Sequence, residues 1–318
     1  MTAPTADPIV LESTTARLTI DPAAGGRLAS LVVAGSELLV TEGMGPIMWG
    51  CYPMAPFAGR IRDGRFTFDG RGHTLPRAMP PHAIHGTVLD RAWTVDGVVH
   101  GARHGEATLS IDLGPDWPFA GRVSQRIVLG SGGLQASLRI DATEPMPVSM
   151  GWHPWFRRTL TGTADAPVLP SQAARLAFDP EWMYERGPDG LPTGRLVPPS
   201  AGPWDDCFTG VHTPPRLVWP DRFALEIASS CDHWVVYSEP DYAICVEPQT
   251  APPGAVERDP AVARPGEPLT ATMTWHWWAL GPGTSGSDAG DAEELRQDGA
   301  EEVAGDAGDG RQGQDLEA

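Results

Sequence analysis

The sequence predicts an all-β protein, a large antiparallel β-sandwich folded as a single domain. The chain holds 37 Gly and 33 Pro scattered through its body, which leaves few windows long enough for a helix. Several segments alternate apolar and polar residues with a period of two, the pattern of half-buried strands. Asp-Gly dipeptides, which favour the tight turns of hairpins, punctuate the chain. These three observations together predict strands joined as hairpins and meanders.

The strands can be placed in chain order. Residues 65–68 lie between two Asp-Gly dipeptides and are predicted to be a short strand flanked by turns. Residues 123–129 and, more clearly, 134–140 alternate apolar and polar side chains. Residues 269–280 set Met273, Trp275 and Trp277 against threonines and a histidine, which predicts a last strand whose aromatic side chains complete the core.

The charge of the chain divides it into a body and a tail. Residues 284–318 contain 11 acidic residues and two arginines, a net charge of −9 out of −18. They contain almost no large apolar side chains, so we expect this acidic tail to be disordered. No linker or repeat interrupts residues 1–283, which we expect to form the β-sandwich domain.

Composition excludes several classes of function. The chain contains no lysine, since all 23 basic residues are arginine, and this excludes Schiff-base chemistry, pyridoxal phosphate and a Walker-type phosphate loop. The body carries the other −9, and this acidity argues against a nucleic-acid partner, because phosphate binding needs clustered positive charge. No apolar run is long enough for a membrane span, and residues 1–10 lack the apolar core of a signal peptide. We therefore expect a cytoplasmic protein, a monomer or a homodimer.

The four cysteines predict neither a disulfide framework nor a zinc site. Cys51, Cys207, Cys231 and Cys245 show no Cys-x-x-Cys spacing. Buried, reduced thiols are expected.

Two residues are the first candidates for proton-transfer chemistry. His153 lies in Gly151-Trp152-His153-Pro154-Trp155-Phe156, after a predicted strand, and Glu247 follows the apolar Ile244-Cys245-Val246. A buried carboxyl group must be paired or have a raised pKa, so Glu247 is either a general base or half of a structural ion pair. His153 is either a general acid or a hydrogen-bonded core residue.

Four further groups are weaker candidates. Arg60 and Arg62 alternate around Ile61, so one could reach a ligand while the other pairs with Asp63. His82 and His85 have a spacing that could serve a metal, with a loop carrying one surface histidine as the alternative. Asp205, in Trp204-Asp205-Asp206-Cys207-Phe208, belongs either to a site or to a solvated turn. The 12 Trp residues together with Arg, His and Asp favour a carbohydrate, because indole rings stack on sugars.

Taken in chain order, five segments resemble the aldose 1-epimerases, or galactose mutarotases. The family shows a proline-rich segment ending in Asn-Arg-Ile, then His-Gly, Trp-His-Pro with aromatics, an Asp before Phe, and Glu-Pro near the C-terminus. The resemblance runs from about residue 15 to 280, and its counterparts here are residues 53–66, Ile84-His85-Gly86, Gly151–Phe156, Asp205–Phe208 and Val246–Thr250.

The resemblance implies a large β-sandwich with a sugar lying across one sheet. It implies that Glu247 takes the proton of the anomeric hydroxyl as general base and that His153 protonates the ring oxygen as general acid. Arg60, His85 and Asp205 would bind the sugar, with no cofactor and no metal. Two positions depart from the family: Gly59 replaces the usual Asn, and Trp155 replaces Tyr or Phe.

Three alternatives stay open at the level of the sequence. An epimerase acting on a sugar phosphate would need extra arginines, for which Arg62, Arg157 and Arg158 are candidates. A non-catalytic sugar-binding protein would keep the aromatic residues and lose the acid/base pair. A cupin-like metal enzyme would use His82, His85, His153 and Glu247.

Overall fold

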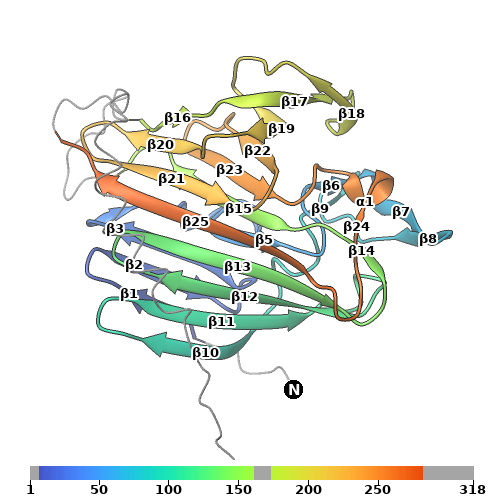
Figure 1. Cartoon of the computed structure of the whole chain (residues 1–318), viewed down its shortest axis with the longest axis horizontal. Coiled ribbons are helices and arrows are strands. Elements are labelled where there is room, and N and C mark those ends of the chain that lie inside the picture. The colour runs from blue at the N-terminus through green and yellow to red at the C-terminus, as the bar shows by residue number, and fades with distance from the viewer. Residues whose placement is uncertain (1–6, 161–172, 282–318) are drawn as a thin grey trace, which may run out of the picture.

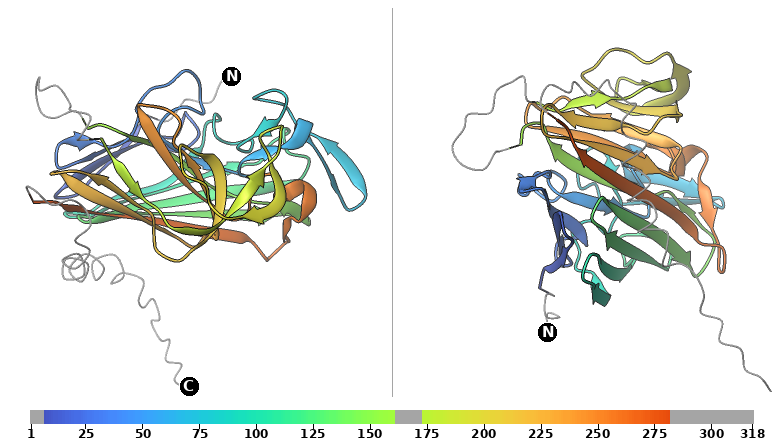
Figure 2. Two further views of the ribbon diagram at one scale, coloured as in Figure 1. Left: turned by 90° about the horizontal axis from the view of Figure 1, so that it is seen from above. Right: turned by 60° about the vertical axis from the view of Figure 1, so that its left-hand side comes forward.

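Two large antiparallel sheets form the protein, packed face to face (Figures 1 and 2). The computed structural model describes residues 7–160 and 173–281. The predicted all-β antiparallel sandwich is confirmed. The boundary expected at residue 283 and the tail of residues 284–318 lie outside the described residues.

The first sheet has 11 strands and carries the candidate residues His153, Glu247 and Asp205. Its strands, in spatial order, are β1 (Ile9–Glu12), β2 (Ala16–Asp21), β3 (Arg27–Val33), β5 (Cys51–Met54), β15 (Gly151–Arg157), β23 (Ala243–Gln249), β22 (His233–Tyr237), β19 (Asp205–Val211), β17 (Pro180–Arg186) and β18 (Pro192–Val197), with β4 (Ser36–Glu37) paired to β3.

The second sheet has eight strands and lies in front of the first in the view of Figure 1. Its order is β10 (Thr94–His100), β11 (Gly105–Asp112), β12 (Gly121–Leu129), β13 (Gly133–Ala142), β25 (Leu269–Ala279), β21 (Phe223–Ser229), β20 (Arg216–Trp219) and β16 (Arg175–Ala177). The strands predicted at 123–129, 134–140 and 269–280 are therefore confirmed as β12, β13 and β25.

Three two-stranded pairs and two short helices complete the described fold. The hairpin of β7 (Arg65–Phe68) and β8 (Arg71–Thr74) turns at Asp69-Gly70, where both residues have positive φ, 48° and 72°. This is the tight turn that the Asp-Gly dipeptide predicts. The other elements are β6 (Arg60–Ile61) with β9 (Ala83–Ile84), β14 (Met146–Val148) with β24 (Ala261–Ala263), the 3-10 turn η1 (Arg62–Gly64) and α1 (Ala255–Arg258).

The main core lies between the two sheets. Trp152 and Phe156 of β15 point into it, and Phe156 packs against Trp275 of β25 with ring centroids 4.9 Å apart. Alternate residues of β15 and its neighbours point the opposite way and form a second apolar cluster that includes Tyr52, Trp155 and Cys245. The outer face of the 11-stranded sheet is therefore also buried along its centre, because loops cover it.

None of the helices in residues 7–160 and 173–281 is long and apolar enough to cross a membrane. The four cysteines are buried free thiols, as expected.

Candidate active site

Strand register places the candidate acid and base opposite each other. Gly151 pairs with Gln249 and Trp155 with Cys245 in the antiparallel ladder of β15 and β23, so His153 lies across from Glu247. His153 also pairs with Tyr52 on β5, on the other side. Because side chains alternate between faces with a period of two, these groups share the outer face of the sheet.

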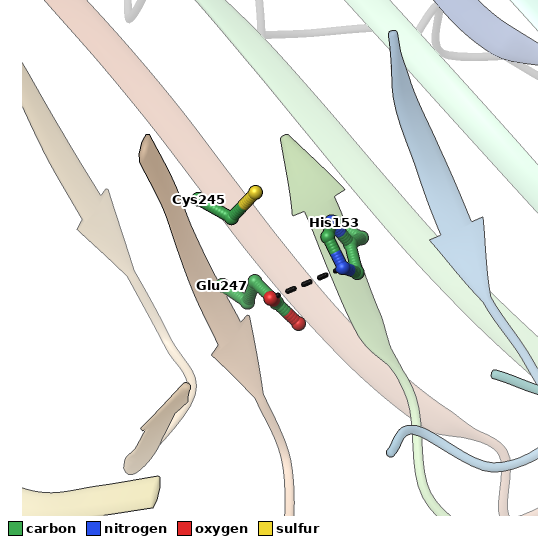
Figure 3. Close-up of side chains that lie close together, drawn as sticks. All are labelled: His153, Cys245 and Glu247. Carbon is green, nitrogen blue, oxygen red and sulfur yellow. Dashed lines mark ion pairs between the residues drawn. The ribbon is translucent and has the colours of Figure 1, made fainter. Parts of the chain in front are cut away.

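His153 and Glu247 are in direct contact. Nε2 of His153 lies 3.2 Å from Oε1 of Glu247, and Figure 3 shows the two side chains pointing toward each other from neighbouring strands. The other carboxyl oxygen of Glu247 accepts a hydrogen bond of 3.3 Å from the Gln249 amide. His153 is 5% exposed and Glu247 1%, so the contact is shielded from water.

Burial favours the neutral form of both groups. It raises the pKa of Glu247 well above its ordinary value, with the charge of Asp205 adding to the rise and Arg60 opposing it. It lowers the pKa of His153 to about 3, although a weaker interaction with the residue's own backbone raises that pKa. In these neutral forms the Glu247 carboxyl group carries a proton, and Nε2 of His153 lies within reach of it, 3.2 Å from Oε1.

A strained loop brings His85 to the same place. His85 has a φ of 57°, uncommon for a non-glycine residue, and its backbone N–H donates to the Gly59 carbonyl at 2.8 Å. Its ring lies edge-on to His153 with centroids 5.0 Å apart. Burial lowers the pKa of His85 well below its usual value, and nearby positive charge adds to this.

Asp205 begins β19 on the same face and is shared by two arginines. The Asp205 carboxylate lies 3.9 Å from Arg60 and 3.3 Å from Arg186. Burial raises the pKa of Asp205, while the two guanidinium groups lower it. A small cleft adjoins these residues. Its lining includes Arg60, Tyr184, Arg186, Asp205 and Pro253.

Several sequence-based expectations are wrong at the level of local structure. Asp205 lies in a strand rather than a solvated turn, and the segment around His153 is itself a strand. Arg62 pairs with Asp189 instead of Asp63, because the chain leaves the β conformation at η1, where Asp63 has a φ of 51°.

The histidine pair also differs from expectation. Both His82 and His85 are buried, so neither is a surface histidine. His82 Nδ1 accepts the N–H of Asp63 at 3.1 Å. Within residues 7–160 and 173–281, the group of metal-ligand type joins His153 and Glu247 with Cys245, all three ligand atoms lying within 4.8 Å of one another. The set with His82 and His85 that the metal alternative requires is therefore not assembled there.

Arg186 is the residue at this site that sequence reasoning missed. Arg186 ends β17, which pairs with β19, the strand that carries Asp205. No local sequence motif marks Arg186. The remaining candidates, His153, Glu247, Arg60, His85 and Asp205, converge on one region of the sheet.

The chain is similar to known proteins along most of its length. The family model for aldose 1-epimerase matches residues 9–276. Galactose mutarotase of Rattus norvegicus is 30% identical over 111 residues, which are 34% of this chain and 32% of the rat protein. Galactose mutarotase of Mus musculus is 27% identical over 144 residues, 44% of this chain and 40% of the mouse protein. These matches thus span between about a third and two fifths of the curated relatives.

Solved structures share the fold. A galactose mutarotase-like protein from Clostridium acetobutylicum superposes with a TM-score of 0.74 at 17% identity, covering 86% of this chain and 95% of that one. Galactose 1-epimerase from Lactobacillus acidophilus gives 0.71 at 15% identity, covering 86% and 94%. At these identities the likeness establishes the fold, while the family match over residues 9–276 establishes the kinship. The chain belongs to the aldose 1-epimerase family.

Proposed function

We propose that this protein is an aldose 1-epimerase that interconverts the α and β anomers of a free aldohexose, with Glu247 as general base and His153 as general acid. The observation that carries the proposal is the buried 3.2 Å contact between these two side chains. A proton-sharing pair is what the reaction needs, because ring opening removes one proton from O1 and adds one to O5.

The proton count balances over a full cycle. In the reactive state the shared proton is on His153 and Glu247 is ionised. The charge of Arg60 favours the ionised carboxylate and opposes the protonated imidazole. Glu247 takes the O1 proton while His153 gives its proton to O5, and the C1–O5 bond breaks to give the open-chain aldehyde. After rotation about C1–C2, His153 takes the proton back from O5 as the ring closes on the other face of C1, and Glu247 returns its proton to O1.

Three residues around the pair fit the task of binding the sugar. His85 lies beside His153, so we assign His85 and Arg60 to the region of the ring oxygen. Asp205, held by two guanidinium groups, is placed to accept hydrogen bonds from ring hydroxyls. The charges of Asp205, Arg60 and Arg186 offset one another, which suits a neutral polyol better than a charged ligand.

The arginines that a sugar phosphate would need are engaged elsewhere. Arg62 pairs with Asp189. Arg157 donates to the Leu39 carbonyl at 2.7 Å, and Arg158 donates to the Pro240 and Ser238 carbonyls at 2.8 and 2.6 Å. This favours a free sugar over a phosphorylated one. A binding protein without catalysis has no use for the buried acid/base pair.

Polarimetry of freshly dissolved α-D-glucose or α-D-galactose tests the proposal. The protein should accelerate mutarotation, and Glu247→Gln should lower kcat by about 10² to 10⁴ while sugar binding survives, because the base is lost and the shape is kept. His153→Asn tests the acid in the same way.

Glu226→Gln provides a matched control. Glu226 is also a buried strand glutamate, but it lies on the eight-stranded sheet and pairs with Arg216 at 3.0 Å. The Glu226→Gln variant should keep the kcat of the unaltered protein. Equal turnover of Glu247→Gln and the unaltered protein would remove Glu247 as the base, and no acceleration with a panel of free aldoses would refute the proposed activity.

A further inference from the structure

At Nδ1, the imidazole of His153 lacks a hydrogen bond to another residue, the contact that ordinarily orients a catalytic histidine. Such a ring is usually fixed by a partner on the nitrogen that does not react. In the described part of the chain, Nδ1 of His153 is buried without a hydrogen-bond partner, while Nε2 faces Glu247. Something other than a hydrogen bond at Nδ1 must therefore hold the ring at the angle the contact requires.

Two nearly parallel aromatic rings pack against the imidazole. The Tyr52 centroid lies 4.9 Å away with an interplanar angle of 24°, and the Trp155 centroid lies 5.3 Å away with an angle of 12°. Both residues are buried, at 0% and 3% exposure. Rotation of the His153 ring about its Cβ–Cγ bond would drive its edge into these neighbours, so the packing restricts its orientation.

A single backbone carbonyl anchors both rings. The Tyr52 hydroxyl donates to the Ile47 carbonyl at 3.1 Å, and Nε1 of Trp155 donates to the same oxygen at 2.9 Å. One carbonyl oxygen can accept two such bonds. The two rings are thus fixed relative to each other as well as to the strands that carry them.

The loop that supplies this carbonyl is held in turn. Arg27, 1% exposed, donates to the Trp49 and Leu89 carbonyls at 3.0 and 2.9 Å, and its guanidinium lies 4.1 Å from the Trp49 ring centroid. The Gly50 carbonyl accepts the backbone N–H of Trp155 at 2.9 Å. Residues 47–50 are therefore tied to β3 and to β15.

We propose that the Ile47 carbonyl, Tyr52 and Trp155, here called the Ile47 brace, orient the His153 imidazole for proton transfer. Tyr52 and Trp155 are positioning residues, and the inference rests on the proposed role of His153. It also gives Trp155, one of the two departures from the family, a specific role: its ring stacks on the imidazole and its Nε1 donates a hydrogen bond to this carbonyl.

The test uses Tyr52→Phe, Trp155→Phe and the double variant, assayed by polarimetry for kcat and KM. Each single change removes one donor and leaves an aromatic ring, so kcat should fall by about 3- to 10-fold with KM within about twofold. The double variant leaves the Ile47 carbonyl without either donor, and its kcat should fall by more than about 100-fold, which exceeds the product of the two single effects. Unchanged kcat in the double variant, or a rise in KM alone, would overturn the proposal.

Trp93→Phe is the matched control. Trp93 is equally buried, and its Nε1 donates to the Val88 carbonyl at 3.1 Å, outside the brace. This variant should lose thermal stability as Trp155→Phe does and keep the kcat of the unaltered protein.

A measurement without turnover separates this proposal from the proposed function. In ¹H–¹⁵N NMR spectra of the imidazoles, with the His153 signals assigned from His153→Asn, the unaltered protein should show one sharp tautomer, and the brace variants should show broadened or doubled signals. Unperturbed His153 signals in both single variants would refute the brace, even if the double variant did not fold. If the signals change but no aldose is epimerised, the orienting contact stands and the assigned chemistry fails.

Discussion

Gly59→Asn introduces the residue type usual in the family, and the structure predicts that it is harmful in this chain. Gly59 has a φ of +68°, and a Cβ at this position would lie 2.6 Å from Cβ, 2.7 Å from Cγ and 3.0 Å from Cα of Pro253. Contacts below 3.0 Å between carbon atoms require one side to move. Pro253 is a rigid ring that lines the cleft beside Arg60, so it cannot give way as the end of a flexible side chain would.

The magnitude has two parts. The left-handed backbone conformation costs a non-glycine residue about 1 kcal/mol, somewhat less for asparagine. Overpacking against Pro253 adds about 1 to 3 kcal/mol. The free energy of unfolding should therefore fall by about 2 to 4 kcal/mol, which lowers the melting temperature of a protein of this size by roughly 3 to 7 °C.

Thermal unfolding followed by circular dichroism tests this value against two further variants. Gly35→Asn has a similar φ of +78° and nothing within 4 Å of its Cβ position, so it measures the backbone contribution alone. Pro253→Gly in the Gly59→Asn background removes the two closest atoms and should recover most of the overpacking loss, as a double-mutant cycle would show. Equal losses for Gly59→Asn and Gly35→Asn, with no coupling to Pro253, would refute the reasoning.

Two more predictions concern charge at the site. Between about pH 4.5 and 6.5, the ordinary pKa values of Glu and His, unfolding adds a proton at His153 and releases one at Glu247, so the two contributions oppose each other. The contribution of His153 to the free energy of unfolding is lost as the pH falls below 6.5. The contribution of Glu247 is lost as the pH rises above 4.5. Glu247→Gln and His153→Asn should therefore change the pH slope of the unfolding free energy in opposite directions, each by up to about 1.4 kcal/mol per pH unit, measured by urea unfolding at several pH values; slopes that move the same way would contradict the shared-proton pair. Arg186→Gln should raise KM by about tenfold with a smaller effect on kcat in polarimetry, because Asp205 loses one of its two guanidinium partners, whereas Arg195→Gln, which breaks the exposed pair with Glu185 on the same hairpin, should change neither; equal KM values in the two variants would argue against a role for Arg186.

Periodicity predicts strands only where one face meets the core and the other meets solvent. β12 and β13 follow that pattern, and their sequences alternate accordingly. Residues 151–156 of β15 are all buried, because the second sheet covers one face and loops cover the other. Alternation disappears from such a strand, which is why the strand carrying His153 was not predicted from its own sequence.

The candidate site was predictable where a side chain carries the chemistry within a local motif. Five residues predicted in this way, including His153 and Glu247, lie close together in the structure. Arg186 was not predictable, because its place beside Asp205 depends on the pairing of β17 with β19. Ile47 was not predictable either, because it acts through its carbonyl, and no side-chain pattern marks a backbone acceptor.

The same register that packs the core also sets the proton pair. On β23, Ile244 and Val246 enter the core between the sheets, while Cys245 and Glu247 face the opposite way. A slip of one residue between β23 and β15 would exchange these faces and drive the Glu247 carboxyl into the apolar core beside Trp152 and Phe156, without His153 as a partner. Burying an unpaired carboxyl group costs several kcal/mol, and the apolar contacts of Ile244 and Val246 would be lost as well. Because both terms oppose the slip, the packing of the sandwich itself holds Glu247 opposite His153, and the Ile47 brace has only the remaining rotation of the imidazole ring to restrict.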